Sequence, residues 1–214
     1  MRIAMIGATG LIGRALAPRL VAAQHDVLLI GRRPAGISGA EERVAPTDQW
    51  PGLLAGEAVD VAISTLGTTI RQAGSWDAFR AVDVDAVLGF ARAAKAAGAR
   101  QMLSVSSVGA MAGARNKYLA MKGETERELA KIGFERLDIV RPGLLRGDRG
   151  GEKRIVERIG LAISPLANLL LRGALDRFAA IDAGTVAAAM AMLVGAAGAK
   201  RQIHFNRDLK QLVS

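Results

Sequence analysis

The feature that most constrains this chain is a short apolar stretch that runs directly into regularly spaced glycines, Ile3-Ala4-Met5-Ile6-Gly7-Ala8-Thr9-Gly10-Leu11-Ile12-Gly13. This order predicts a buried strand, a tight turn and the start of a helix. A helix N-terminus has amide N–H groups without intrahelical partners, and the helix dipole favours an anion there. The stretch therefore predicts a phosphate site over Gly7, Thr9, Gly10, Leu11, Ile12 and Gly13. An ordinary strand–turn–helix is the alternative, because the spacing G-x-x-G-x-x-G differs from the dinucleotide-binding G-x-G-x-x-G.

Apolar runs alternate with helical patterns along the rest of the chain. Strands are predicted over 3–6, 27–30, near 44, and over 59–63, 102–105, 137–140 and 202–205, and helices over 11–23, 76–97, 118–132 and 184–194. Continuous apolar strands separated by helices are typical of a parallel sheet covered on both faces. We expect an α/β fold with a doubly wound parallel sheet. One domain over 1–214, with a small C-terminal cap over about 143–180, is the simplest division.

Composition excludes several kinds of site. The 214 residues include no cysteine and only two histidines, His25 and His204, so thiol chemistry is excluded and no metal site is expected. We find no leader and no apolar run of membrane-spanning length, which predicts a cytoplasmic location. The net charge of +9 is scattered and aromatics are few. This favours an anionic small molecule over nucleic acid or a membrane surface.

Two arginines, Arg32 and Arg33, follow the second predicted strand. In dinucleotide-binding folds this strand end meets the adenosine ribose, where an acid binds the free 2′-hydroxyl and an arginine accommodates a 2′-phosphate. Guanidinium groups bind phosphate bidentately, so the pair favours NADP(H) over NAD(H). Solvated surface arginines are the alternative.

The fourth strand ends in small and hydroxylic residues, Ser64-Thr65-Leu66-Gly67-Thr68-Thr69. The carboxyl end of a central strand lines the ligand crevice of an open α/β sheet. We therefore expect Leu66, Gly67 and Thr68 to contact the cofactor, although a simple tight turn explains the segment equally well.

The one tyrosine of the chain, Tyr118, lies four residues before Lys122 on a predicted helix. An i, i+4 pair shares one helix face. A nearby ammonium stabilises a phenolate, which adapts a tyrosine hydroxyl to proton transfer. Ser106 and Ser107 follow the fifth strand, so a serine hydroxyl could reach the same crevice. This combination predicts acid–base chemistry at the crevice.

Taken together, these segments resemble the atypical branch of the short-chain dehydrogenase/reductase superfamily, and in particular its Tat-interacting-protein-like group, a neighbour of the NmrA-like proteins. The matching motifs are Gly7 to Gly13, Leu29-Ile30-Gly31-Arg32-Arg33, Leu66-Gly67-Thr68-Thr69, Val82-Asp83-Val84-Asp85, Ser106-Ser107-Val108-Gly109-Ala110, Tyr118 to Glu124, and Arg141-Pro142-Gly143. They cover residues 1 to about 150, whereas the last third is less distinctive.

The resemblance implies specific roles for individual residues. Tyr118 would donate a proton to a substrate carbonyl, Lys122 would bond the nicotinamide ribose, and Ser107 would polarise the carbonyl, with Ser106 as its reserve. The segment Pro142, Gly143 and Leu144 would pack beside the nicotinamide.

The chain departs from the family pattern in several places. The interval from Ser107 to Tyr118 is short. Asp83 stands where many relatives have a structural asparagine, which puts the usual water relay in doubt. Asp48, a candidate for the adenine amine, lies in a poorly matching segment.

Two functions remain open at this stage. The first is an NADPH-dependent reductase of a small carbonyl compound. The second is a non-catalytic module whose NADP(H) occupancy tunes binding to a protein partner, since some relatives of this branch are thought to be redox-sensing regulators. The amphipathic stretch 152–172 fits a packed cap helix, a substrate lid, a homo-oligomer face or a membrane-surface helix.

Overall fold

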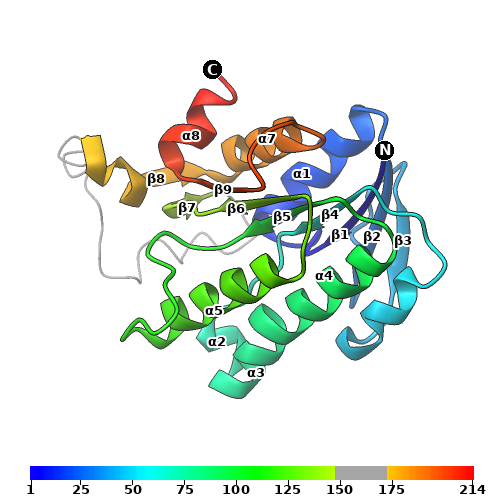
Figure 1. The fold of residues 1–214 in the computed structure, drawn as a ribbon, viewed down its shortest axis with the longest axis horizontal. Helices are drawn as coiled ribbons and strands as arrows, with labels where there is room; N and C mark the ends of the chain where they lie inside the picture. The colour runs from blue at the N-terminus through cyan, green and yellow to red at the C-terminus, as the bar shows by residue number, and fades with distance from the viewer. Residues whose placement is uncertain (148–172) are drawn as a thin grey trace.

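The computed structural model describes residues 1–147 and 173–214, and its centre is a seven-stranded parallel sheet (Figure 1). The strand order is β3-β2-β1-β4-β5-β6-β9. The strands are β1 (Arg2–Ile6), β2 (Asp26–Gly31), β3 (Glu41–Val44), β4 (Val61–Ser64), β5 (Gln101–Val105), β6 (Arg136–Val140) and β9 (Arg201–His204). All six strand pairings are parallel. The predicted doubly wound parallel sheet is confirmed.

Helices cover both faces of this sheet (Figure 1). One layer contains α1 (Leu11–Ala22), α7 (Ala183–Leu193) and α8 (Asn206–Gln211). The opposite layer contains α2 (Ile70–Ala73), α3 (Trp76–Arg80), α4 (Val87–Ala96) and α5 (Lys117–Lys131). Between α3 and α4 lies a π-helical turn, Ala81–Ala86, and short 3-10 helices span Thr47–Leu54 and Gly173–Phe178. A separate two-stranded parallel sheet joins β7 (Leu144–Arg146) to β8 (Ala180–Asp182).

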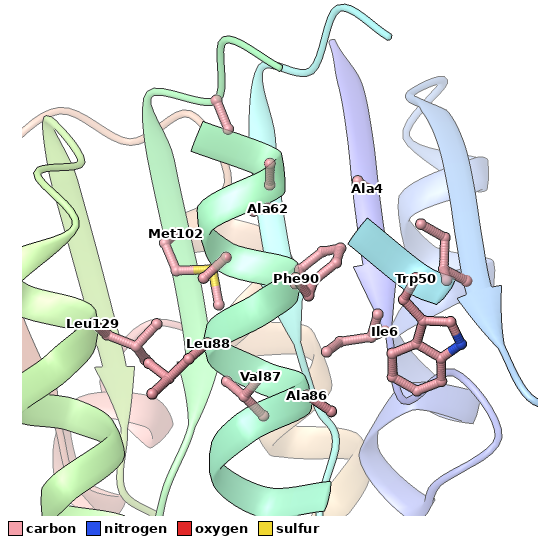
Figure 2. Close-up of a cluster of buried hydrophobic side chains, with 14 of the residues drawn as sticks. Ala4, Ile6, Trp50, Ala62, Ala86, Val87, Leu88, Phe90, Met102 and Leu129 are labelled. Carbon is pink, nitrogen blue, oxygen red and sulfur yellow. The ribbon is translucent and has the colours of Figure 1, made fainter. Parts of the chain in front are cut away.

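Alternate residues of the central strands point to opposite faces of the sheet, as the two-residue period of a strand requires, and belong to two separate hydrophobic cores. In β1, Ile3 and Met5 face α1 and α7, whereas Ala4 and Ile6 face α4 and the helix Thr47–Leu54. Figure 2 shows the second core, where Phe90 of α4 and Trp50 lie near Ile6. The near-continuous apolar sequence of these strands follows from burial on both faces.

A buried polar network fastens β5, β6 and β9 to the end of α7. The Asp138 carboxylate accepts hydrogen bonds from Gln101 and Arg136 and lies 2.8 Å from His204 Nε2. Gln101 also donates to the carbonyl of Leu193. Burial works against the charged form of Asp138, but these hydrogen bonds outweigh it and hold the Asp138 pKa below its ordinary value.

The elements differ from the sequence predictions in a few places. The single helix expected over 76–97 is divided by the π-helical turn. The helix Thr47–Leu54 and the short elements α2, α8, β7 and β8 were not predicted. The expected amphipathic stretch 152–172 lies outside the described residues, as does the central part of the expected cap.

Candidate functional site

The carboxyl ends of five strands bring the predicted site segments to one edge of the sheet. The glycine turn follows β1, the two arginines follow β2, and Leu66-Gly67-Thr68 follows β4. Ser106 and Ser107 follow β5, and Pro142-Gly143 follows β6. Strands β1 and β4 are neighbours although their crossovers run to opposite sides, which makes this the topological switch point where open α/β sheets bind ligands.

Two of the three glycines in the first turn have no room for a side chain. A Cβ on Gly7 would lie 2.5 Å from the Leu66 amide nitrogen, and Gly7 also has a φ of +86°. A Cβ on Gly13 would lie 2.2 Å from the Gly7 carbonyl oxygen. The Thr65 hydroxyl donates to that same carbonyl at 3.1 Å. The turn after β1 is therefore packed directly against the end of β4.

The third glycine, Gly10, is the N-cap of α1 and makes no side-chain cap. The first turn of α1 contains no acidic residue. Its amide N–H groups, at Leu11, Ile12 and Gly13, are therefore available to an anion at the helix start. Close approach of the backbone and a free helix end are what a bound pyrophosphate needs.

A cavity of about 320 Å³ opens beside this turn. Its walls come from the ends of β1, β2, β3 and β4 and from the helix Thr47–Leu54; they include Gly7, Thr9, Arg32, Arg33, Trp50 and Leu66. Trp50 is buried and donates from its indole nitrogen to the Ala45 carbonyl at 3.0 Å. Asp48, the sequence candidate for the adenine side, is exposed and is not part of this wall.

The arginines along the cavity differ in their availability. Arg43 donates from its three guanidinium nitrogens to Glu41, the Leu53 carbonyl and Glu57, so each of these nitrogens already has a protein partner. Arg32 and Arg33 are exposed, and neither is paired with a protein group in the described part of the chain.

Glu42 shapes the loop that carries the two free arginines. Its carboxylate accepts the backbone N–H of Ala35 at 2.8 Å and that of Ile37 at 2.9 Å. A carboxylate engaged in this way fixes the loop after β2 beside the cavity. Sequence reasoning missed Glu42 and Trp50, which lie in the short strand β3 and in the 3-10 helix Thr47–Leu54.

Lys122 and Asp83 form a buried ion pair farther along the same edge. Lys122 Nζ lies 2.6 Å from Asp83 Oδ1, and the two side chains are only 7% and 1% exposed. Asp83 Oδ2 accepts the backbone N–H of Thr68 at 2.8 Å. A Cβ on Gly67 would lie 3.8 Å from Lys122 Nζ, so Gly67 borders the pair. Asp83, the residue that departs from the family pattern, thus contacts Lys122 directly.

Tyr118 is half-buried one helical turn before Lys122, and its ring packs edge-on against Phe79 with centroids 5.7 Å apart. The two serines have different surroundings. Ser106 is buried and donates to Glu126 at 2.5 Å, and Glu126 is paired with Arg141. The Ser107 hydroxyl is half-buried and contacts only its neighbour, the Val108 carbonyl, at 3.3 Å among the described hydrogen bonds. Ser107 is therefore the serine that can donate to a ligand.

The segment after β6 is held by a residue that sequence reasoning missed. Gly143 donates its N–H to Asn206 Oδ1 at 3.0 Å, and a Cβ on Gly143 would lie 2.2 Å from the Ala179 carbonyl oxygen. The amide of Asn206 also donates to the carbonyls of Ala179 and Asp176. Pro142 is buried, and Leu144 begins β7. Asn206 thus fixes the place of the segment beside the crevice.

The part of the chain that is described contains neither a candidate metal site nor a membrane-spanning helix. Residues 1–147 and 173–214 contain no group of three or more histidine, cysteine, aspartate or glutamate side chains arranged to hold a metal ion. None of the helices placed in these ranges is sufficiently long and apolar to span a bilayer.

A protein-family model described as NAD(P)H-binding matches residues 7–163. This match includes the glycine turn, the arginine pair, the loop after β4 and the helix that carries Tyr118 and Lys122. It covers well over half of the chain.

Curated relatives of similar length come from fungi. The chain is 33% identical over 166 residues to protein FMP52-1, mitochondrial, of Scheffersomyces stipitis, which covers 74% of each protein. It is 39% identical over 155 residues to the FMP52 protein of Eremothecium gossypii, covering 70% of this chain and 68% of that one. Against FMP52 of Coccidioides immitis the identity is 32% over 203 residues, with coverage of 87% and 82%.

The names of these relatives correct one prediction. They are described as mitochondrial proteins, so the predicted cytoplasmic location is wrong. That prediction rested on finding no leader, which does not identify a compartment.

Solved structures with the same fold include nicotinamide-cofactor enzymes. MoeE5 in complex with UDP-glucose and NAD has a TM-score of 0.72 and 13% identity, covering 95% of this chain and 75% of that one. A UDP-galactose 4-epimerase has a TM-score of 0.69 at 19% identity, with coverage of 95% and 76%. A short-chain dehydrogenase/reductase superfamily protein from Agrobacterium tumefaciens with bound NAD has a TM-score of 0.64 at 19% identity, with coverage of 90% and 73%.

Site geometry, family match and fold agree. The glycine turn and the cavity beside it lie within the matched residues, and the turn offers the close backbone approach and the N–H donors that a pyrophosphate needs. The chain belongs to the NAD(P)H-binding family, and it has the Rossmann fold seen in a short-chain dehydrogenase/reductase superfamily protein, as the sequence resemblance predicts.

Proposed function

We propose that this protein is an NADPH-dependent reductase of a small carbonyl compound. The observation that carries the cofactor preference is the pair Arg32 and Arg33, exposed and unpaired in the described chain at the wall of the 320 Å³ cavity. An arginine in this place accommodates a 2′-phosphate, whereas an acid would bind the free ribose hydroxyl of NAD. The nearby acid, Glu42, is occupied by two backbone amides. Its hydrogen-bonding capacity is therefore directed at the loop rather than at a ligand.

Each end of the proposed site has its own residues. The N–H groups at the start of α1 would hold the pyrophosphate, and the loop Leu66-Gly67-Thr68 would border the cofactor between its two halves. Lys122 would bond the nicotinamide ribose from beside Gly67. When NADPH is bound, its nicotinamide supplies a hydride for the carbonyl carbon.

The chain's own residues complete the proposed reduction. The Tyr118 hydroxyl gives its proton to the carbonyl oxygen, so that the carbonyl becomes an alcohol. The Ser107 hydroxyl donates a hydrogen bond to the same oxygen and stabilises the charge that develops there. Ser106 does not compete for this role because its hydroxyl already donates a hydrogen bond to Glu126.

The cofactor preference is tested by replacing both arginines. In Arg32→Ala/Arg33→Ala we expect the Kd for NADPH to rise about 10- to 100-fold, because charge-assisted hydrogen bonds to the 2′-phosphate are lost. The Kd for NADH should change little. Isothermal titration with both cofactors measures the two effects, and Arg92→Ala, an exposed arginine on α4, is the matched control. Equal losses for the two cofactors would refute the assignment.

A further inference from the structure

The chain just before the two cavity arginines is held by the end of strand β3. Ala45, the residue after β3, donates its N–H to the Gly31 carbonyl at 3.0 Å. A Cβ on Gly31 would lie 3.2 Å from the Arg33 carbonyl oxygen, so the backbone turns back sharply over Gly31. The two arginines therefore lie on a tight bend directly after β2, residues 31–34, which we call the arginine bend.

Glu42, in β3 itself, holds the chain just after the arginine bend. Glu42 Oε2 accepts the Ala35 N–H at 2.8 Å, and Glu42 Oε1 accepts the Ile37 N–H at 2.9 Å. Hydrogen bonds to an ionised carboxylate are stronger than those between neutral groups. The Ala35 and Ile37 side chains also pack against the core on the α1 side of the sheet. Loss of the Glu42 carboxylate should therefore loosen this part of the loop without detaching it.

The two arginine side chains depend on their backbone for their position. Arg32 and Arg33 are exposed, and neither is paired with a protein group in the described part of the chain. Pro34 follows directly, and its ring fixes the backbone φ there. The region that the two guanidinium groups can reach is thus set by the fixed points on either side, at Gly31 and at Ala35.

The negative charge of Glu42, taken alone, opposes the binding of a phosphate. Glu42 lies in the wall of the same cavity as the two arginines. Like charges repel, so removing this carboxylate would strengthen the binding of an anion if charge were its only influence. Its hydrogen bonds to the loop act in the opposite direction, because a site that is already ordered costs less free energy to fill. The two influences can therefore be told apart by the sign of the effect.

We propose that Glu42 is a positioning residue that sets the preference for NADPH over NADH, because it holds the arginine bend in the shape that receives the 2′-phosphate. This inference rests on the proposed function for the identity of the phosphate, and it adds the residue that prepares the phosphate site. NADH has a hydroxyl where NADPH has this phosphate. The binding of NADPH therefore depends on the arginine bend, whereas that of NADH does not.

The first test measures the Kd of both cofactors for Glu42→Ala by isothermal titration. We expect the Kd for NADPH to rise about tenfold, because the arginine bend must then be ordered as the ligand binds. The Kd for NADH should stay within about twofold of the wild-type value. Unchanged or tighter NADPH binding would overturn the proposal, and so would equal losses for the two cofactors, which indicate a general loss of structure.

Two further variants separate the contact from its charge and from folding. Glu42→Gln keeps the size of the side chain but places an NH₂ group where one oxygen accepted an N–H. It should raise the Kd for NADPH about threefold, and it decides the question if Glu42→Ala does not fold. A Kd that stays the same or falls in Glu42→Gln would contradict the proposal. Asp48→Asn removes an exposed carboxylate from the helix Thr47–Leu54 and should bind both cofactors as the wild type does.

Hydrogen exchange tests the contact without any ligand. In Glu42→Ala the N–H groups of Ala35 and Ile37 lose their acceptor, so we expect both to exchange at least about tenfold faster than in the wild type. Exchange as slow as in the wild type would mean that the carboxylate does not hold the loop, which ends the proposal. Neither this measurement nor the Kd values involve turnover, so they stand whether or not the protein reduces a carbonyl.

A double-mutant cycle shows whether Glu42 acts through the arginines. When Glu42→Ala is added to Arg32→Ala/Arg33→Ala, the Kd for NADPH should rise by less than about twofold, because the groups that Glu42 positions are already absent. A further tenfold rise would place its effect elsewhere and refute the proposal. If the arginine variant itself shows no selective loss of NADPH, the proposed cofactor preference fails; if it does and Glu42→Ala does not, only the role of Glu42 fails.

Discussion

At the scale of single residues, side chains of the same type in the site differ in whether a protein partner already binds them. Ser106 and Ser107 are neighbours with the same hydroxyl, yet one is committed to a buried carboxylate and the other faces its own backbone. Arg32 and Arg43 both line the cavity, but in the described chain only the guanidinium of Arg43 donates hydrogen bonds to protein partners. Sequence motifs identify candidates of the right chemistry, and the contacts decide which candidate is free to act.

Tyr118→Phe tests the proposed acid directly. This change removes the hydroxyl but keeps the ring that packs on Phe79, so the fold and the cofactor affinity should be retained. Loss of a general acid costs about 10²- to 10⁴-fold in rate. We therefore expect kcat to fall by this factor while the Kd for NADPH stays within about twofold. The measurement combines NADPH consumption with a panel of carbonyl compounds and a cofactor titration; an unchanged kcat would refute the acid role.

The same residues show how much of the site a sequence can give. The glycine turn, the arginine pair and the Tyr118–Lys122 spacing are local patterns, and each lies at the sheet edge where it was expected. Asn206 carried no signal, because its partner Gly143 is 63 residues away. Trp50 was also missed, since nothing in the segment before Pro51 distinguishes a cavity wall from a loop.

At the scale of elements, strands were easier to predict than the pieces between them. The central strands are buried on both faces and appear as apolar runs, so their positions were predicted to within one or two residues. The helix 76–97 was predicted as continuous, because a π-helical turn changes the backbone but leaves the apolar periodicity almost intact. Strands β7 and β8 have three residues each, which is too short for a recognisable alternation.

The polar network on β6 gives the fold a dependence on pH. The Asp138 pKa is below its ordinary value in the folded chain, because its hydrogen bonds outweigh the cost of burial. Around pH 4 the unfolded state therefore binds more protons than the folded state, and the free energy of unfolding rises with pH there. The stabilisation is complete above this range and is lost as the pH falls through the folded value.

Asp138→Asn tests this linkage. We expect the variant to be less stable near neutral pH, because the partners Arg136 and His204 lose their carboxylate. As the pH is lowered from about 6 to about 3, the free energy of unfolding should also fall less for this variant than for the wild type. Urea unfolding across this range measures both quantities. Asp48→Asn, at an exposed position, is the control and should follow the wild-type curve. Parallel curves for Asp138→Asn and the wild type would contradict the prediction.

At the scale of the whole molecule, the two halves of the crevice are built from different parts of the chain. The cavity beside the glycine turn uses residues between Gly7 and Leu66. The other end uses the loops after β5 and β6, helix α5 and, through Asn206, the start of α8. The alternation of strands and helices in the sequence was enough to predict the fold class. The contact between Asn206 and the segment after β6 is seen only in the structure.

Asn206→Ala measures how strongly the later part of the chain supports the crevice. The change leaves the Gly143 N–H, the buried Ala179 carbonyl and the partly buried Asp176 carbonyl without their partner. Unsatisfied buried groups of this kind cost about 1–3 kcal/mol each, before relaxation or water entry. We expect a clear loss in the free energy of unfolding and weaker substrate binding, with the Kd for the adenosine half (measured with 2′-phospho-ADP-ribose) nearly unchanged. Arg207→Ala, the exposed neighbour, is the control; equal stability of the two variants would contradict the prediction.

The bond between Gly143 and Asn206 also sets an order of events during synthesis. A chain leaving the ribosome contains every residue of the glycine turn and of the cavity wall beside it once it has been made through Leu66. The segment after β6 has no fixed place until the chain has been made through Asn206, 63 residues later. Helix α1, which begins at the glycine turn, packs against α7, a helix that is made only shortly before Asn206. Because a domain generally folds as a unit, we expect the glycine turn and the segment after β6 to become ordered together, when synthesis is nearly complete.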